Sequence, residues 1–129
     1  MRSGRRANPF TVPKPWDVVI DGEAAAFTNC VYKRGPVFKP LTDADFAAVS
    51  LAAGTTGDWF LYRKVNTQTG VTTVGFSNVT TGDDRYCDTT VPEDAEFERS
   101  PLYRLTRAAE TDPWYVACDY RDISLVLHV

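Results

Sequence analysis

The sequence has little of the chemistry that catalysis and metal binding usually require. It contains one histidine, His128, and three cysteines, Cys30, Cys87 and Cys118. No two cysteines have the C-x-x-C spacing of a zinc ribbon or a thioredoxin-type motif, and a structural zinc site needs about four Cys or His ligands. A Ser/Cys–His–Asp arrangement has His128 as its only candidate base. We therefore expect no catalytic residues, no metal and no other cofactor.

Long apolar runs are also missing. No stretch of the 129 residues approaches the ~18 consecutive apolar residues of a membrane-spanning helix. The first ten residues are basic and lack the apolar core of a secretory signal. We expect synthesis inside the cell, no membrane partner, and incorporation into a virion as one destination.

Charge is distributed unevenly along the chain. Residues 1–14 carry four basic side chains and no acid, which leaves 10 of the 14 basic residues and all 17 acidic residues for the rest. A basic arm on an acidic body is typical of a chain that binds nucleic acid or an acidic neighbour; a solvated terminus without a partner is the alternative. The residues expected to contact a partner are Arg2, Arg5, Arg6, Phe10, Lys14 and Trp16.

Acidic residues concentrate between positions 83 and 98. We interpret this segment as a solvated loop on which a basic arm can dock, for example the arm of a neighbouring copy. It does not match the EF-hand calcium pattern. The expected docking residues are Asp83, Asp84, Asp88, Glu93, Asp94 and Glu96.

Two hairpins are the clearest structural signals. Trp16–Ile20 and Ala24–Lys33 flank Asp21-Gly22, a dipeptide that favours tight turns. Asp58–Val65 and Val71–Val79 flank a five-residue loop that ends in glycine. A third strand at Arg85–Val91 would extend the second hairpin into an antiparallel meander. Residues 103–109 are expected to form a strand or a helical turn, and the segments 114–120 and 123–129 are both β-rich.

One helix is expected, over Asp43–Ala53. Phe46, Val49 and Ala53 recur at helical spacing, and Gly54 can end the helix in a left-handed conformation. The complete prediction is a mainly β fold of six to eight strands, a small antiparallel barrel or sandwich. It carries this single short helix and an extended arm at 1–15, with one β-rich domain at 16–129.

Aromatic residues are frequent on the expected strands. Most of them should lie in the core, and the remainder should line a ligand cavity or form a subunit contact, where Trp and Tyr are favoured. The strand aromatics are Trp59, Phe60, Tyr62, Trp114, Tyr115 and Tyr120.

Two short segments, Gly57-Asp58-Trp59 and Cys118-Asp119-Tyr120-Arg121, match motifs of a known family. The first resembles the G-x-W signature and the second the T-D-Y-x region, with cysteine in place of threonine, of the lipocalins, a family of ligand-binding β-barrels. The resemblance implies a closed barrel that holds a small hydrophobic molecule.

The arm, the acidic body and the missing catalytic sets favour a non-enzymatic structural or assembly subunit of a larger complex. A virion or phage component is the favoured example. Such a subunit would form homo- or hetero-oligomers, with nucleic acid as a further partner of the arm. The alternatives are a small hydrophobic-ligand-binding barrel and, third, an enzyme that uses carboxylates alone.

Overall fold

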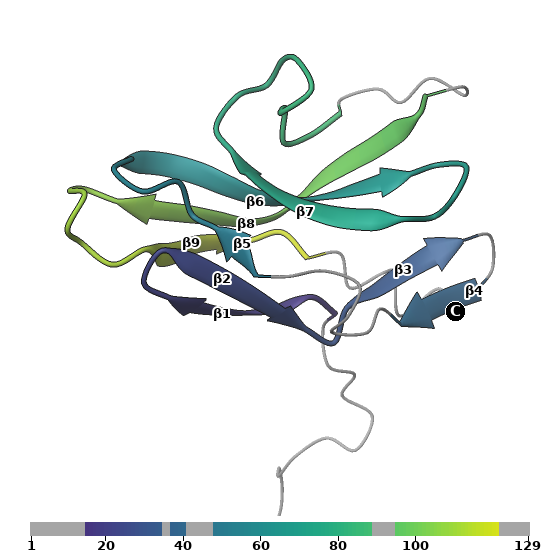
Figure 1. Cartoon of the computed structure of the whole chain (residues 1–129), viewed down its shortest axis with the longest axis horizontal. Helices are drawn as coiled ribbons and strands as arrows, with labels where there is room; N and C mark the ends of the chain where they lie inside the picture. The colour runs from purple at the N-terminus through teal and green to yellow at the C-terminus, as the bar shows by residue number, and fades with distance from the viewer. Residues whose placement is uncertain (1–14, 35–36, 41–47, 89–94, 122–129) are drawn as a thin grey trace, which may run out of the picture.

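The computed structural model describes residues 15–34, 37–40, 48–88 and 95–121. Within these ranges the protein consists of nine β-strands and no α-helix (Figure 1). The strands form three antiparallel sheets, with the orders β1-β2-β5, β3-β4 and β7-β6-β8-β9. The predicted mainly β fold is confirmed for this part of the chain, which contains no helix long and apolar enough to cross a membrane. Residues 1–14 of the predicted arm lie outside the described residues.

The first sheet begins with the hairpin that the sequence predicts. β1 (Asp17–Asp21) pairs with β2 (Ala24–Thr28) over five residue pairs. Gly22 in the turn has a φ of 60°, which costs glycine little because it has no Cβ.

The predicted strand Ala24–Lys33 is divided in the structure. Asn29 has a φ of 54° and ends β2. The chain then continues as β3 (Val31–Arg34), which pairs with β4 (Val37–Pro40) in a separate two-stranded sheet.

The predicted helix is wrong over its second half, and residues 43–47 lie outside the described residues. Val49 and Ser50 form β5 (Val49–Ser50), which pairs with β2. Leu51 is fully buried, and its N–H donates to the Glu23 carbonyl over 2.7 Å. Helix propensities differ by less than about 1 kcal/mol per residue, so pairing and burial against the sheet outweigh them.

The four-stranded sheet contains the longest strands. β6 (Gly57–Asn66) and β7 (Thr72–Ser77) form the second predicted hairpin. The other neighbour of β6 is β8 (Phe97–Arg107), and β9 (Tyr115–Asp119) completes the sheet. The predicted meander is therefore wrong: residues 85–88 are not a strand, and 89–91 lie outside the described residues.

The two larger sheets pack face to face around one hydrophobic core. One side contributes Trp16, Ala25, Phe27 and Leu51, and the other contributes Leu61, Leu102, Tyr103, Leu105 and Trp114. Neither sheet closes on itself among the described residues. The sandwich alternative is thus the one that the structure supports, and the closed barrel, including the calyx implied by the lipocalin resemblance, is wrong for this part of the chain.

Candidate functional site

The root of the predicted arm is held in the core. Trp16 is 1% exposed. Its backbone N–H donates to the Asn29 carbonyl over 3.0 Å, and its backbone carbonyl accepts a hydrogen bond from the Tyr103 hydroxyl over 3.0 Å. Its ring meets Phe27 edge to face, with 6.2 Å between the centroids. Trp16, expected to contact a partner, is placed in the core of its own chain.

The backbone at this root adopts an unusual conformation. Trp16 has a φ of 66°, a conformation that costs a non-glycine residue about 1–3 kcal/mol and persists only where surrounding contacts enforce it. Burial raises the pKa of Tyr103 from its ordinary value of about 10 to about 12, so its hydroxyl stays protonated and able to donate to Trp16 at a higher pH than that of an exposed tyrosine. Pro15 is also buried, and the chain therefore enters the domain at a fixed point. The remaining predicted arm residues, Arg2, Arg5, Arg6, Phe10 and Lys14, lie outside the described residues.

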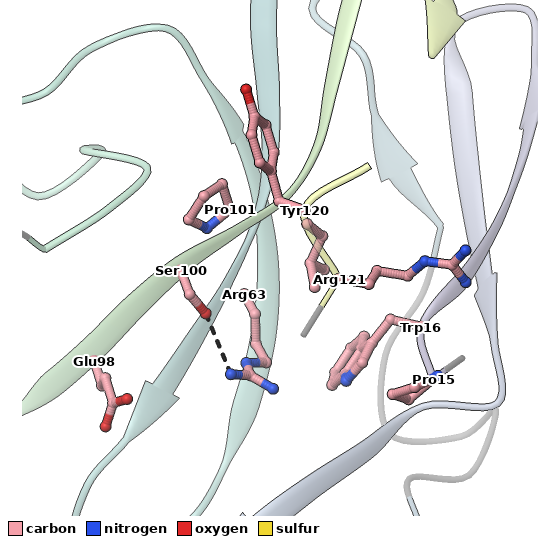
Figure 2. A pocket seen from close by; sticks show the side chains of 9 residues that line it. Pro15, Trp16, Arg63, Glu98, Ser100, Pro101, Tyr120 and Arg121 are labelled. Carbon is pink, nitrogen blue, oxygen red and sulfur yellow. Dashed lines mark hydrogen bonds between the residues drawn. The ribbon is translucent and has the colours of Figure 1, made fainter. Parts of the chain in front are cut away.

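A cavity of about 210 Å³ opens beside the arm root (Figure 2). Figure 2 shows Trp16 and the Arg63 side chain bordering the same space, with a hydrogen bond of 3.2 Å from Arg63 Nη2 to Ser100 Oγ. The lining comes from the arm root, from β6 and β8, and from the end of β9: Pro15, Trp16, Arg63, Ser100, Tyr120 and Arg121.

Arg121 connects the two large sheets at the side of this cavity. It forms ion pairs with Asp17 at the start of β1 and with Asp119 at the end of β9, the latter over 2.8 Å. The hydrogen bonds that Arg121 donates to the Asp119 carboxylate are the main reason that the pKa of Arg121 is raised. The charge of Arg121 is therefore balanced by two carboxylates of its own chain.

The cavity offers groups for binding rather than a catalytic pair. The Ser100 hydroxyl already accepts a hydrogen bond from Arg63, and the described lining residues include no histidine or cysteine that would activate it. Glu98 adds one carboxylate to the lining. In the described ranges, no three His, Cys, Asp or Glu side chains are placed to hold a metal ion.

The acidic segment contains both exposed and internally paired carboxylates. Asp88 has a side chain 6% exposed, lies 2.7 Å from Arg85 Nε and 3.8 Å from Arg99 Nη1, and accepts the Arg99 backbone N–H over 3.0 Å. Asp88 therefore fixes its loop to β8 instead of offering a docking charge. Of the other predicted docking residues, Asp83, Asp84 and Glu96 are exposed, and Glu93 and Asp94 lie outside the described residues.

A second cavity, of about 290 Å³, lies around Arg107. Arg107 is buried, donates to the Thr55 carbonyl over 2.6 Å and to Glu23 over 3.2 Å, and lies 4.3 Å from the centre of the Trp114 ring. These contacts tie β8 to the turn of the first hairpin. Sequence reasoning missed them because Glu23 and Arg107 are 84 positions apart.

The strand aromatics divide between the core and the outer surface. Trp114 and Tyr62 are buried, whereas Tyr115 is 60% and Tyr120 is 38% exposed. Phe60 stacks on Tyr86 with 3.9 Å between ring centroids. Because side chains alternate along a strand, the run from Trp59 to Tyr62 already indicates that some of its aromatics face outward.

Comparison with known proteins identifies no relative. No family model matches the sequence, no curated protein matches it, and no solved structure matches the fold.

Proposed function

We propose that this chain is a non-enzymatic structural subunit of a larger assembly, such as a virion, and that its basic arm binds the acidic surface of a neighbouring subunit. The observation that carries the proposal is the buried arm root. The backbone of Trp16 makes two hydrogen bonds, and its side chain is buried in the hydrophobic core. The charged residues before it therefore start from a fixed position on the domain.

The length of the arm suits contact with another subunit. Fourteen residues span at most about 50 Å when fully extended, whereas a domain of this size has a radius of gyration of about 13 Å. A tethered arm also acts at a high effective concentration on a neighbour within its reach. The arm can thus reach beyond its own domain.

Charge favours an acidic target. The arm carries Arg2, Arg5, Arg6 and Lys14, and the rest of the chain has seven more acidic than basic residues. Asp83 and Asp84 are exposed. Attraction between such groups falls off over about 10 Å at 0.1 M salt, so this contact should weaken as salt is added.

The ligand-binding alternative has less support from the described residues. Apolar side chains fill the space between the sheets, and the cavity at the arm root is lined by Arg63, Glu98 and Arg121. A hydrophobic molecule would have to leave these charged groups without water, which is costly.

The test is the solution mass of a variant in which Arg2, Arg5, Arg6 and Lys14 are all replaced by Gln. We expect the intact chain to associate at about 0.1 M salt, and both the variant and about 1 M salt to reduce its mass. Replacing Arg2, Arg5 and Arg6 by Lys is the matched control, because it keeps the charge. Equal masses for the intact chain and the Gln variant would contradict the proposal, and association that requires added DNA would assign the arm to nucleic acid.

A further inference from the structure

The outer face of the four-stranded sheet carries an arginine in an aromatic setting. Arg104 on β8 lies directly across from Phe60 on β6 and from Cys118 on β9. Residues paired in this way share one face of a sheet. The Phe60 ring is stacked with Tyr86 on one side, and its centroid lies 6.2 Å from that of Tyr120.

Arg104 differs from the other arginines whose side chains the structure describes. Arg63 donates to a hydroxyl, Arg85 and Arg99 interact with Asp88, Arg107 pairs with Glu23, and Arg121 pairs with Asp17 and Asp119. For Arg104, the described part of the chain provides no hydrogen-bond or ion-pair partner, and its Nε is buried without one. A partly buried cation of this kind is costly, and the carboxylate of a binding partner would satisfy it.

Within the described part of the chain, one half of this outer face is covered by a loop. Residues 82–88 lie over the half that contains Tyr62 and Arg99: Arg99 Nη2 donates to the Asp83 carbonyl over 3.2 Å, and Asp88 accepts from the Arg99 backbone. The other half exposes Tyr115 and Tyr120. The covering loop also contributes the Tyr86 ring, which stacks on Phe60 at the border of this half. We call the surface formed by Phe60, Tyr86, Arg104, Tyr115 and Tyr120 the aromatic face. Tyr and Arg are enriched at the centres of protein interfaces.

A carboxylate for which the described residues provide no hydrogen-bond or ion-pair partner lies at the border of the same face. Asp84 is exposed, and it precedes Tyr86 by two residues in the loop that covers Tyr62. The Asp83 carbonyl, one residue earlier, accepts a hydrogen bond from Arg99 Nη2 over 3.2 Å, and Tyr86, two residues later, stacks on Phe60, so the chain at Asp84 lies over the outer side of the sheet. Burial and then the charge of Asp84 raise the pKa of Tyr62 on the same side. Asp84 and Arg104 therefore lie on one surface, with the Tyr86–Phe60 stack near both.

We infer that the aromatic face binds the same face of a second copy of this chain, so that Arg104 of each copy pairs with Asp84 of the other. In a two-fold interface, the same patch of each copy faces the other copy. That patch must therefore carry both members of every charge pair. The uncharged aromatic rings would form its centre and the two charge pairs its border. The inference rests on the proposed assembly function and names one contact within it.

The test uses two charge reversals in the intact chain, Arg104→Glu and Asp84→Lys, measured by sedimentation equilibrium. Each variant alone places like charges opposite each other twice, so its dimer should be weaker than that of the original chain by more than about tenfold. An equimolar mixture of the two variants restores both pairs, one native and one reversed. We expect the mixture to dimerise nearly as well as the original chain, which no effect on folding alone would produce.

A milder variant separates loss of the dimer contact from loss of folding. Arg104→Gln removes the unpaired charge and should weaken the dimer while leaving the thermal midpoint of the monomer unchanged or higher. Asp21→Lys, an equal charge change at an exposed residue of β1, is the matched control and should leave the dimer intact. A mixture that stays monomeric, or Arg104→Gln with the original affinity, would overturn the inference.

The same measurements separate this contact from the arm. If removal of residues 1–14 abolishes all association and the Arg104 variants change nothing, the proposed function stands and this inference fails. If the truncated chain still forms a dimer that Arg104→Glu dissociates, the face is an interface independent of the arm. If the truncated chain also has the same mass as the intact chain, the arm proposal is the one that fails.

Discussion

At the scale of single residues, Trp16 anchors the start of the described part of the chain. Its side chain is 1% exposed and packs against Phe27. Trp16→Ala should lower the free energy of unfolding by about 3–5 kcal/mol, because it leaves a large cavity in the core. Val19→Ala, at a side chain 61% exposed, is the control and should change it by less than about 0.5 kcal/mol. Urea unfolding measures both, and equal effects would contradict the placement of Trp16.

Tyr103 gives a prediction about alkaline pH. An unfolded tyrosine has a pKa of about 10, and burial raises that of Tyr103 to about 12 in the folded protein. A raised pKa means that the stabilising contribution is complete below pH 10 and is lost as the pH rises from 10 to 12. The Tyr103→Phe variant should not show this loss of stability between pH 10 and pH 12.

The measurement is the free energy of unfolding of both proteins between pH 9 and pH 12. Other tyrosines and lysines titrate equally in both proteins, so their effects cancel in the difference. Parallel curves for the two proteins would show that Tyr103 titrates normally.

At the scale of elements, the β6–β7 hairpin depends on Asn66. Its Oδ1 accepts hydrogen bonds from the N–H groups of Gln68 and Thr69, both over 3.0 Å. Asn66→Ala should lower the free energy of unfolding by about 1 kcal/mol, and Asn66→Asp should lower it less because a carboxylate oxygen can still accept both hydrogen bonds. Chemical denaturation of the two variants tests this order of stability. An Asp variant less stable than the Ala variant would contradict the prediction.

The loop at residues 82–88 depends on Asp88. Asp88→Asn leaves the charge of Arg99, a residue 5% exposed, without its carboxylate, and breaking such a buried pair costs about 3 kcal/mol or more. Amide hydrogen exchange should therefore become faster in this loop. Asp83→Asn, at an exposed neighbour in the same loop, is the matched control. Equal exchange rates in both variants would show that Asp88 does not hold the loop.

Local signals explain which elements the sequence predicts. The two hairpins carry their turn residues and alternating strands within short segments, so both were predicted. β5 was missed because Val49 and Ser50 pair with β2, an interaction that the helical spacing of their own segment does not reveal. The order β7-β6-β8 was missed because β8 joins β6 across the intervening acidic segment.

At the scale of the whole molecule, the candidate site is assembled by pairs that are distant in the sequence. Arg63 and Ser100 are 37 positions apart, and Arg121 and Asp17 are 104 apart. No local pattern marks such pairs, and one sequence alone cannot show them. The distribution of charge along the chain did predict a basic arm and an acidic body, because charge can be counted from the sequence without knowledge of the fold.

The central claim is that the arm joins subunits, and the most direct test is the solution mass of the chain with and without residues 1–14. The truncation should end before Pro15, because Pro15 and Trp16 are buried in the domain. We predict that the intact chain at about 0.1 M salt has a mass well above its 14.4 kDa monomer, and that removing the arm or adding salt to about 1 M lowers it. The same mass for both chains at both salt concentrations would contradict the claim.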